Sequence, residues 1–219
     1  MQRRELWDRI AAVFFPHSCV FCGAVVEYED HWCGRCDIPR REQLLYPGEI
    51  TAAASPLLYA GGAKHAVLAL KRHPDKRTAR CLAQLMEELF RRCFPSARPG
   101  CIVPVPVSGA ELRRRGHNHA GLLARALGER MELPVRELLA RADGSQKQSA
   151  LPAAQRARNA ERSYHKAPGA APDGERVLLV DDVYTTGATA AACGRALREA
   201  GAERVYVLTA TMVEQGQGR

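Results

Sequence analysis

Two adjacent aspartates follow directly after a run of four aliphatic residues in the C-terminal part of the chain. The run is Val177 to Val180, and the acids are Asp181 and Asp182. A buried carboxylate loses its hydration and costs free energy unless a partner compensates it. Two acids at the end of an apolar strand therefore indicate that something outside the strand uses them. Carboxylates accept hydrogen bonds, and the vicinal hydroxyls of a sugar can donate them.

The five residues TTGAT, from Thr185 to Thr189, come next and begin an expected helix. Successive backbone N–H groups, threonine hydroxyls and a helix N-terminus form a pocket that favours anions. Gly187 lets the backbone approach such a ligand closely. A phosphate cradle beside a diol-binding acid pair predicts a site for a ribose 5-phosphate. The chain has neither G-x-G-x-x-G nor G-K-[ST], which argues against a Rossmann or P-loop nucleotide site.

Four of the eight cysteines form two C-x2-C pairs, CVFC and CGRC. Two thiolate pairs at this spacing can complete a tetrahedron around one metal ion. Because four sulfur ligands leave no open position, the pattern predicts a structural zinc and not a catalytic one. Reduced thiols in a small core and a redox-active pair are the alternatives, and His17 or His31 could replace one cysteine. The predicted ligands are Cys19, Cys22, Cys33 and Cys36.

The composition is that of an ordinary globular protein, with 219 residues, 46% of them hydrophobic and 26% charged. No stretch approaches the roughly 18–20 uninterrupted apolar residues of a membrane helix. The apolar part of the N-terminus is too short and too interrupted for a signal peptide, so we expect a cytoplasmic protein without disulfides. The net charge of +8 favours phosphates, nucleic acid or a membrane surface as partners, although an arginine-rich composition has other origins.

Three zones are expected along the chain. An amphipathic helix spans 1–18, a four-cysteine module spans 19–46, and a larger unit spans 50–219. Within the larger unit, residues 141–166 are predicted as a long loop, and expected strands alternate with expected helices. Such alternation is typical of an α/β fold with a parallel sheet, whose carboxyl edge binds ligands. The strands are expected at 55–61, 101–107, 177–181 and 205–210, and the helices at 64–70, 79–94, 120–131 and 188–200.

The stretch VLLVDDVYTTGAT closely resembles the PRPP-binding signature of type I phosphoribosyltransferases. This resemblance implies that Asp181 and Asp182 hold the ribose 2′ and 3′ hydroxyls. It also implies that Mg²⁺ accompanies PRPP, bridging pyrophosphate and ribose oxygens, as suits a cation that prefers oxygen ligands. The residues implied to surround the 5-phosphate are Thr185, Thr186, Gly187, Ala188 and Thr189.

Further stretches resemble the ComF family, specifically ComFC-type competence proteins, in which a zinc finger is fused to a phosphoribosyltransferase-like domain. They are VPVPVSGAELRRRGHNHA, QSALPAAQRARN and the four-cysteine cluster, so the resemblance covers nearly the whole chain. The family's usual RGFNQA reads RGHNHA here, with His117 for Phe and His119 for Gln. The implied fold class is α/β, a type I phosphoribosyltransferase-like parallel sheet flanked by helices, with a small N-terminal four-cysteine zinc-finger module.

Arginine suits a diphosphate because its guanidinium donates to two oxygens at once. Arg115 is therefore the preferred pyrophosphate candidate, whereas Arg113 and Arg114 fit a solvated helix face equally well. Lys71 matches a lysine that is usual in the family and is a further phosphate candidate. The loop after Arg141 either closes over PRPP and excludes water, or is a polar linker. The remaining candidates from the resemblance are Gly116, Asn118, Arg141, Gln148, Arg156 and Asn159.

We expect a PRPP-binding, Mg²⁺-dependent phosphoribosyltransferase, associated by resemblance with DNA uptake in natural competence. Thr185 stands where some purine-salvage enzymes carry an acid, so no catalytic residue is assigned, and the acceptor pocket has no signature. The alternatives are a non-catalytic module that handles single-stranded DNA beside a helicase-like partner, and a PRPP-sensing regulator. The acid pair distinguishes the first alternative, because DNA lacks a 2′-hydroxyl and two carboxylates repel it.

Overall fold

The computed structural model describes residues 17–27, 30–36, 38, 40–45, 48–142 and 163–214. The helix expected over 1–18 lies largely outside these ranges. Gln148, Arg156 and Asn159 also lie outside them, so their assignment to a loop over PRPP stays a prediction. Among the described residues, no helix is long and apolar enough to cross a membrane.

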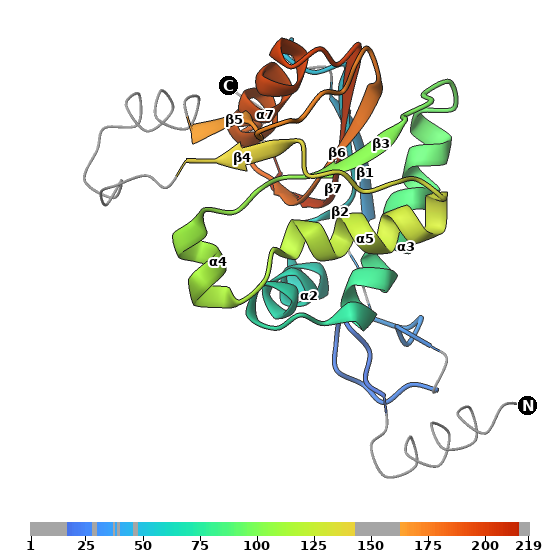
Figure 1. Cartoon of the computed structure of the whole chain (residues 1–219). Coiled ribbons are helices and arrows are strands. Elements are labelled where there is room, and N and C mark those ends of the chain that lie inside the picture. Colours follow the sequence, from blue (N-terminus) through green and yellow to red (C-terminus); the bar gives the residue numbers. More distant parts are fainter. Residues whose placement is uncertain are drawn as a thin grey trace, which may run out of the picture.

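A five-stranded sheet forms the centre of the molecule (Figure 1). The strand order is β1-β2-β7-β6-β3, in which β1 pairs antiparallel with β2 and all other pairs are parallel. The predicted α/β fold with a mainly parallel sheet is confirmed. The strands are β1 (Arg40–Leu45), β2 (Ala52–Leu58), β3 (Cys101–Pro104), β6 (Arg176–Tyr184) and β7 (Arg204–Met212).

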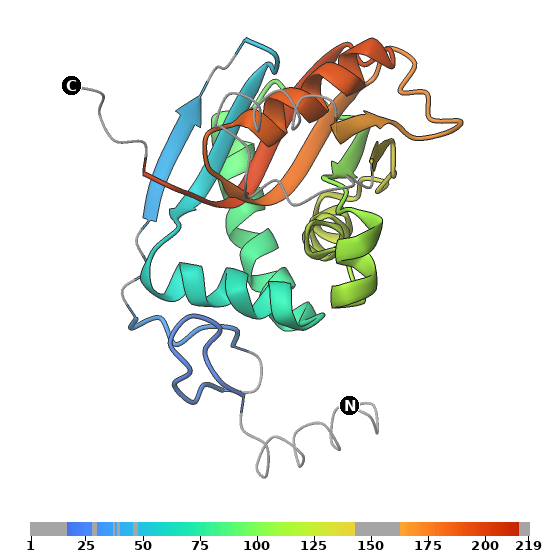
Figure 2. The same cartoon turned by 90° about the vertical axis from the view of Figure 1, so that its left-hand side faces the viewer.

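Helices cover both faces of this sheet (Figure 2). The first face packs against α2 (Gly61–Arg72), α3 (Lys76–Cys93) and α5 (His119–Met131), and the second packs against α7 (Ala188–Glu199). Side chains of β6 alternate between the two layers, because successive residues of a strand point to opposite faces. Leu178 and Val180 join the first core, whereas Val177 and Leu179 join the second. All four are fully buried, which explains the continuous apolar run.

Three local features differ from the expectations. β6 continues through the acids to Tyr184, because Val183 and Tyr184 pair with Thr211 and Met212 of β7. The loop predicted over 141–166 is bounded by a two-stranded ribbon, β4 (Leu139–Arg141) and β5 (Tyr164–Lys166). β1 was not expected as a strand; it falls within the 19–46 range assigned to the cysteine module, yet it pairs with β2.

A short helix, α4 (Gly109–Arg115), was also not expected. Its N-cap is Ser108, whose Oγ accepts a hydrogen bond from the Glu111 N–H at 3.2 Å. Its C-cap is Gly116, whose φ of 75° ends the helix in the left-handed region that favours glycine. The S-x-x-E spacing of Ser108 and Glu111 is a helix-start signal in the sequence that predicts α4.

The cysteine module packs against the first helical layer. Phe21 is 2% exposed, and its backbone approaches Gly62 of α2 so closely that a Cβ at Gly62 would lie 2.8 Å from the Phe21 carbonyl oxygen. Arg77 of α3 donates to the backbone carbonyls of Ser18, at 2.7 Å, and Asp30. These contacts fasten the module to the beginnings of α2 and α3.

We predict that Gly187→Ala destabilises the fold more than Gly174→Ala does. Both glycines have similar positive φ angles, 82° and 77°, which cost a residue with a Cβ about 1–3 kcal/mol. A Cβ at Gly187 would in addition collide with the hydroxyl of the buried Tyr184, whereas a Cβ at Gly174 meets open space. Urea unfolding of the two variants measures the difference, and equal losses of stability would contradict the close approach.

Candidate ligand-binding site

An open pocket of about 200 Å³ lies at the carboxyl ends of β3 and β6. A much smaller hollow of about 20 Å³, enough for roughly one water molecule, lies next to it beneath the turn after β6, and the two share Val105, Asp181 and Thr189. Parallel strands bring their carboxyl ends and the following helix starts to one edge, where open α/β sheets form crevices. The charged, imidazole and phenolic side chains that line the larger pocket are Lys71, Glu111, Arg115, His119, Arg141, Tyr164, Asp181 and Asp182.

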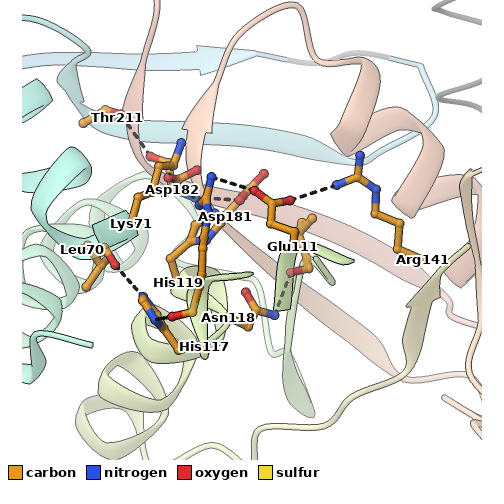
Figure 3. Close-up of polar contacts among 12 residues, drawn as sticks. Leu70, Lys71, Glu111, His117, Asn118, His119, Arg141, Asp181, Asp182 and Thr211 are labelled. Carbon is orange, nitrogen blue, oxygen red and sulfur yellow. Dashed lines mark hydrogen bonds and ion pairs between the residues drawn. The ribbon is translucent and has the colours of Figure 1, made fainter. Parts of the chain in front are cut away.

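Asp182 is the buried charge of this pocket, with 4% of its surface exposed. The Lys71 ammonium, at the end of α2, lies 2.7 Å from Asp182 Oδ2 (Figure 3). On the backbone side, the Thr211 hydroxyl of β7 donates to the Asp182 carbonyl at 3.0 Å. Because an unpaired buried carboxylate is costly, the ammonium compensates a charge that β6 would otherwise bury alone.

Asp181 also lines the pocket, on the other side of the strand. Its Oδ1 accepts a hydrogen bond from the Asp182 N–H at 2.9 Å. Burial, and then the negative charge of Asp182, raise the pKa of Asp181 well above its ordinary value. Any hydroxyl donor or cation that enters the pocket would lower this pKa, because it stabilises the charged form of the carboxyl.

A series of contacts runs from Asp182 across the pocket to β4 (Figure 3). His119 Nε2 faces Asp182 Oδ2 at 3.6 Å, and His119 Nδ1 lies 3.3 Å from NH1 of Arg115. NH2 of Arg115 lies 2.7 Å from Glu111 Oε1, and Arg141 NH1 lies 3.7 Å from Glu111 Oε2. Positive and negative side chains thus alternate around the pocket: Lys71 pairs with Asp182, and both Arg115 and Arg141 pair with Glu111. Each of these cations already has a partner within the protein.

The turn between α4 and α5 is held by side-chain contacts to backbone carbonyls. The buried His117 has Nε2 2.8 Å from the Leu70 carbonyl of α2 and Nδ1 3.0 Å from the Arg115 carbonyl. Asn118 Nδ2 donates to the Val105 carbonyl after β3 at 3.1 Å. These contacts join the end of α2, which carries Lys71, to the segment that carries Arg115 and His119.

The predicted site residues fall into three groups. Lys71, Arg115, Arg141, Asp181, Asp182 and Thr189 line the larger pocket, and Thr185 and Gly187 line the smaller hollow. Thr186 and Ala188 are exposed in the turn, where Thr186 Oγ1 accepts from the Ala188 N–H at 3.4 Å. Gly116 and Asn118 shape the turn before α5 and line neither hollow, and Arg113 and Arg114 are exposed on α4.

Sequence reasoning missed Glu111, Tyr164 and any pocket role for His119. Glu111 stands four residues before Arg115 on α4, and this spacing predicts an ion pair on one helix face. His119 stands four residues after Arg115, its partner at 3.3 Å, but no local signal places it beside Asp182, which belongs to β6. Tyr164 comes from β5, where burial raises its pKa to about 12 and the Arg141 guanidinium lies 5.4 Å from its ring centre.

The four predicted cysteine ligands come together at the other end of the molecule. Their sulfur atoms all lie within 4.8 Å of one another, and the Cys19–Cys36 and Cys22–Cys33 separations are both 3.7 Å. Four thiolates around one zinc at 2.3 Å lie about 3.8 Å apart, so the geometry fits a tetrahedral zinc and is far too long for disulfides. Hydrogen bonds from backbone N–H groups, that of Arg35 first, lower the pKa of Cys33 to about 6. His17 and His31 are not part of this group.

Known proteins resemble this chain over most of its length. It is 28% identical to Competence protein F of Haemophilus influenzae over 197 residues, which cover 88% of this chain and 83% of that protein. It is also 28% identical to DNA utilization protein YhgH of Escherichia coli K12 over 193 residues, 86% of this chain and 81% of that protein.

Two of the solved structures that the chain matches at low similarity are phosphoribosyltransferases. An adenine phosphoribosyltransferase matches with a TM-score of 0.45 and 20% identity, covering 68% of this chain and 75% of that chain. The orotate phosphoribosyltransferase from Aeropyrum pernix matches with a TM-score of 0.37 and 16% identity, covering 80% and 87%.

The family model of the phosphoribosyl transferase domain matches residues 83–219, which is more than half of the chain. This range contains the acid pair, the TTGAT turn and both strands at whose ends the pocket opens. The chain therefore belongs to the phosphoribosyl transferase domain family, and its relatives identify it as a ComF-family protein.

Proposed function

We propose that the protein binds PRPP, or a related ribose 5-phosphate, in the pocket at the carboxyl ends of β3 and β6. The observation that carries this proposal is that the acid pair and three cations from other elements line one pocket, and that residues of the TTGAT turn line the small hollow beside it, with Asp181 and Thr189 common to both. A ligand with hydroxyl donors on one side and phosphates on the others uses all three kinds of group. We propose it further as an Mg²⁺-dependent phosphoribosyltransferase that acts in DNA uptake.

The ribose would lie against β6, where Asp181 and Asp182 accept hydrogen bonds from its hydroxyls. Such hydroxyl donors would offset the raised pKa of Asp181, because they stabilise the charged carboxylate that burial disfavours. Lys71 now compensates Asp182 at 2.7 Å. A phosphate oxygen nearby would draw this ammonium to itself and leave Asp182 free to accept from a hydroxyl.

The 5-phosphate would lie at the start of α7. The N-cap of this helix is Gly187, which has no side chain to accept from the N–H groups of the first turn. A phosphate can therefore accept from them, and the positive end of the helix dipole favours its charge. Thr185 and Thr189 border the hollow on the same side and offer hydroxyl donors.

The pyrophosphate would lie towards α4 and β4, where Arg115 and Arg141 share Glu111 as their partner. Its oxygens would replace Glu111 as acceptors and neutralise both guanidinium groups. The carboxylates of the pocket are oxygen donors of the kind that Mg²⁺ prefers, and Mg²⁺ supplies charge neutralisation to pyrophosphate when it binds. Displacement at C1′ depends mainly on this neutralisation and on positioning, so the proposal names the donor of the transfer and leaves the acceptor open.

We further propose that Cys19, Cys22, Cys33 and Cys36 hold a structural zinc ion. Their sulfur separations of 3.7 Å match a tetrahedral site, and the site has no further ligand position for chemistry. Zinc would stabilise a module whose own core is small, because metal binding adds its free energy to folding.

The names of the two relatives, a competence protein and a DNA utilization protein, favour a second candidate, a module that handles DNA. Single-stranded DNA and a helicase-like partner come into this proposal only from the resemblance to the ComF family. The net charge of +8 supports it. The pocket itself does not contribute this charge, since its three cations face three carboxylates. Substitution of the acid pair should therefore distinguish the two functions, because it should affect PRPP binding and DNA binding differently.

We predict that Asp182→Asn weakens the binding of Mg²⁺·PRPP at least about tenfold, because a hydrogen bond to a charged group contributes about 1.5–3 kcal/mol. Calorimetric titration measures the affinity, with Glu203→Gln as the matched control, since Glu203 pairs with Arg176 on the exposed surface. Single-stranded DNA should bind the Asp182→Asn variant equally or more tightly. Loss of both ligands in a folded variant would contradict the separation, and absence of PRPP binding to the wild type would refute the proposed function.

We predict that Asp181→Asn raises the thermal midpoint of the ligand-free protein while it weakens PRPP binding. The folded state raises the pKa of Asp181, so it disfavours the charged carboxylate and the wild type loses stability as pH rises from about 4 through that raised pKa. The advantage of the variant should therefore grow over this range and reach a plateau above it. Each kcal/mol corresponds to about 2–4 °C in a protein of this size. A midpoint equal to or below that of the wild type at pH 8 would contradict the prediction.

We predict one bound zinc ion per chain, lost in Cys22→Ser and retained in the control Cys93→Ser, whose cysteine lies outside the cluster. Metal analysis of the purified proteins measures this. Removal of zinc with a chelator should make the segment around residues 17–36 sensitive to protease while the sheet stays folded. A zinc-free wild type whose circular dichroism and proteolysis ignore the chelator would refute the metal site.

A further inference from the structure

His119, the first residue of α5, lies between the two halves of the pocket and is 7% exposed. Its Nδ1 lies 3.3 Å from NH1 of Arg115, and its Nε2 faces Asp182 Oδ2 at 3.6 Å. It is therefore in contact with one group of each kind, a cation on the α4 side and a carboxylate on β6. Figure 3 shows the ring between Asp182 and the α4 side of the pocket.

The Arg115 contact decides which ring nitrogen carries the proton. A guanidinium group has only N–H donors and no acceptor, so the Nδ1 that faces it must offer a lone pair. A neutral imidazole then carries its proton on Nε2, which points it at Asp182. Asp182 Oδ2 accepts no well-aligned hydrogen bond in the described structure, despite the nearby Lys71 ammonium, so it has capacity for this N–H.

The surroundings keep the ring neutral. Burial is the main cause that lowers the pKa of His119. The positive charges of Lys71 and Arg115 lower this pKa further. The carboxylates of Asp182 and Glu111 raise it, but their combined effect is smaller, so the pKa of His119 lies below its ordinary value. An imidazolium would turn a second N–H donor towards the Arg115 guanidinium and lose that contact. Charge and hydrogen bonding thus favour the same protonation state.

We propose that His119 is a positioning residue, which as the neutral Nε2–H tautomer bridges Arg115 and Asp182 and orients both for the ligand. The proposal rests on the function proposed above for this pocket. Without the bridge, Arg115 would keep only its ion pair with Glu111, and Asp182 only its ion pair with Lys71. With the bridge, two contacts fix the plane of the guanidinium fork, which is the feature that matches a diphosphate.

The bridge needs a side chain that ends in one acceptor and one donor. A neutral histidine has this pair, and so does glutamine. The exchange of Gln for His therefore keeps both hydrogen-bonding functions. An apolar side chain of similar size keeps neither.

His119, Asp181 and Asp182 each place one possible metal-ligand atom within 4.8 Å of the others. The contact between His119 and Arg115 nevertheless argues against a metal ion bound to His119. A metal on Nε2 would move the ring proton to Nδ1, where it would meet the N–H groups of Arg115. The Lys71 ammonium, 2.7 Å from Asp182 Oδ2, repels a second cation there. His119 thus acts through its hydrogen bond with Arg115 at 3.3 Å and its polar contact with Asp182 at 3.6 Å, and not as a metal ligand.

The first test reads the ligand-free protein. Nitrogen NMR of histidine-labelled wild type at pH 8, with His119 assigned by its loss in His119→Gln, should show a neutral ring protonated at Nε2. The NH1 protons of Arg115, which face His119, should exchange slowly in the wild type and in His119→Gln, and exchange faster in His119→Leu. A ring protonated at Nδ1, an imidazolium, or a His119 signal that ligand-free Mn²⁺ broadens selectively would overturn the proposal.

The second test is calorimetry with Mg²⁺·PRPP. His119→Leu should weaken binding at least about tenfold, and His119→Gln should restore it to within about threefold of the wild type. His65→Gln, an exposed histidine of α2, is the control, and thermal unfolding verifies that the variants fold. Glutamine as weak as leucine, or leucine as tight as the wild type, would overturn the bridge. If the wild type itself does not bind PRPP, the proposed function fails, and the ligand-free NMR alone decides the bridge.

Discussion

The arrangement of the pocket depends on one constraint, the compensation of the buried Asp182 carboxylate. β6 carries this residue into a site with 4% exposure, because its backbone continues to pair with β7 on both sides of the acid. A charge in such a place requires a counter-charge from another element. Lys71 provides it, and α2 must therefore end close to the carboxyl edge of the sheet.

The other contacts around the pocket also pair positive groups with negative ones or hold the segments that carry them. His117 holds the carbonyl of Leu70, the residue before Lys71, and Asn118 holds the segment after β3. Between these anchors, His119, Arg115, Glu111 and Arg141 continue the alternation of charge to β4. An anion alone would therefore bind this pocket with little favourable free energy, because each cation that lines it already has a partner. A ligand with both phosphates and hydroxyl donors would bind more favourably, because its phosphates can pair with the cations while its hydroxyls donate to the carboxylates.

The cysteine module is connected to this pocket through α2. Phe21 packs on Gly62 at the beginning of the helix, and Lys71 lies at its other end. Gly62 has no side chain, and this allows the backbone of the module to approach the helix directly. A tetrahedral zinc would make the packed turn rigid, and the stability of the module thus contributes to the position of a helix that reaches the pocket.

The sequence by itself determined the features whose signals are contiguous. The alternation of strands and helices predicted the parallel α/β sheet, the paired cysteines predicted a cluster, and the acids followed by TTGAT predicted one edge of a ligand site. These features depend on neighbouring residues, so short-range propensity and spacing suffice to find them. The S-x-x-E spacing of Ser108 and Glu111 belongs to the same class, and it would have predicted α4.

Only the tertiary structure decided which distant residues meet. Lys71, Arg115, His119 and Arg141 come from α2, α4, α5 and β4, and packing of these elements on the sheet brings them to Asp182 and Glu111. The same packing tied Asn118 to the Val105 carbonyl and made His117 a link between helices. It also added β1 to the sheet through pairing with β2. Such contacts join residues that lie far apart in the chain, and no local pattern encodes them, because their free energy arises only after the layers have assembled.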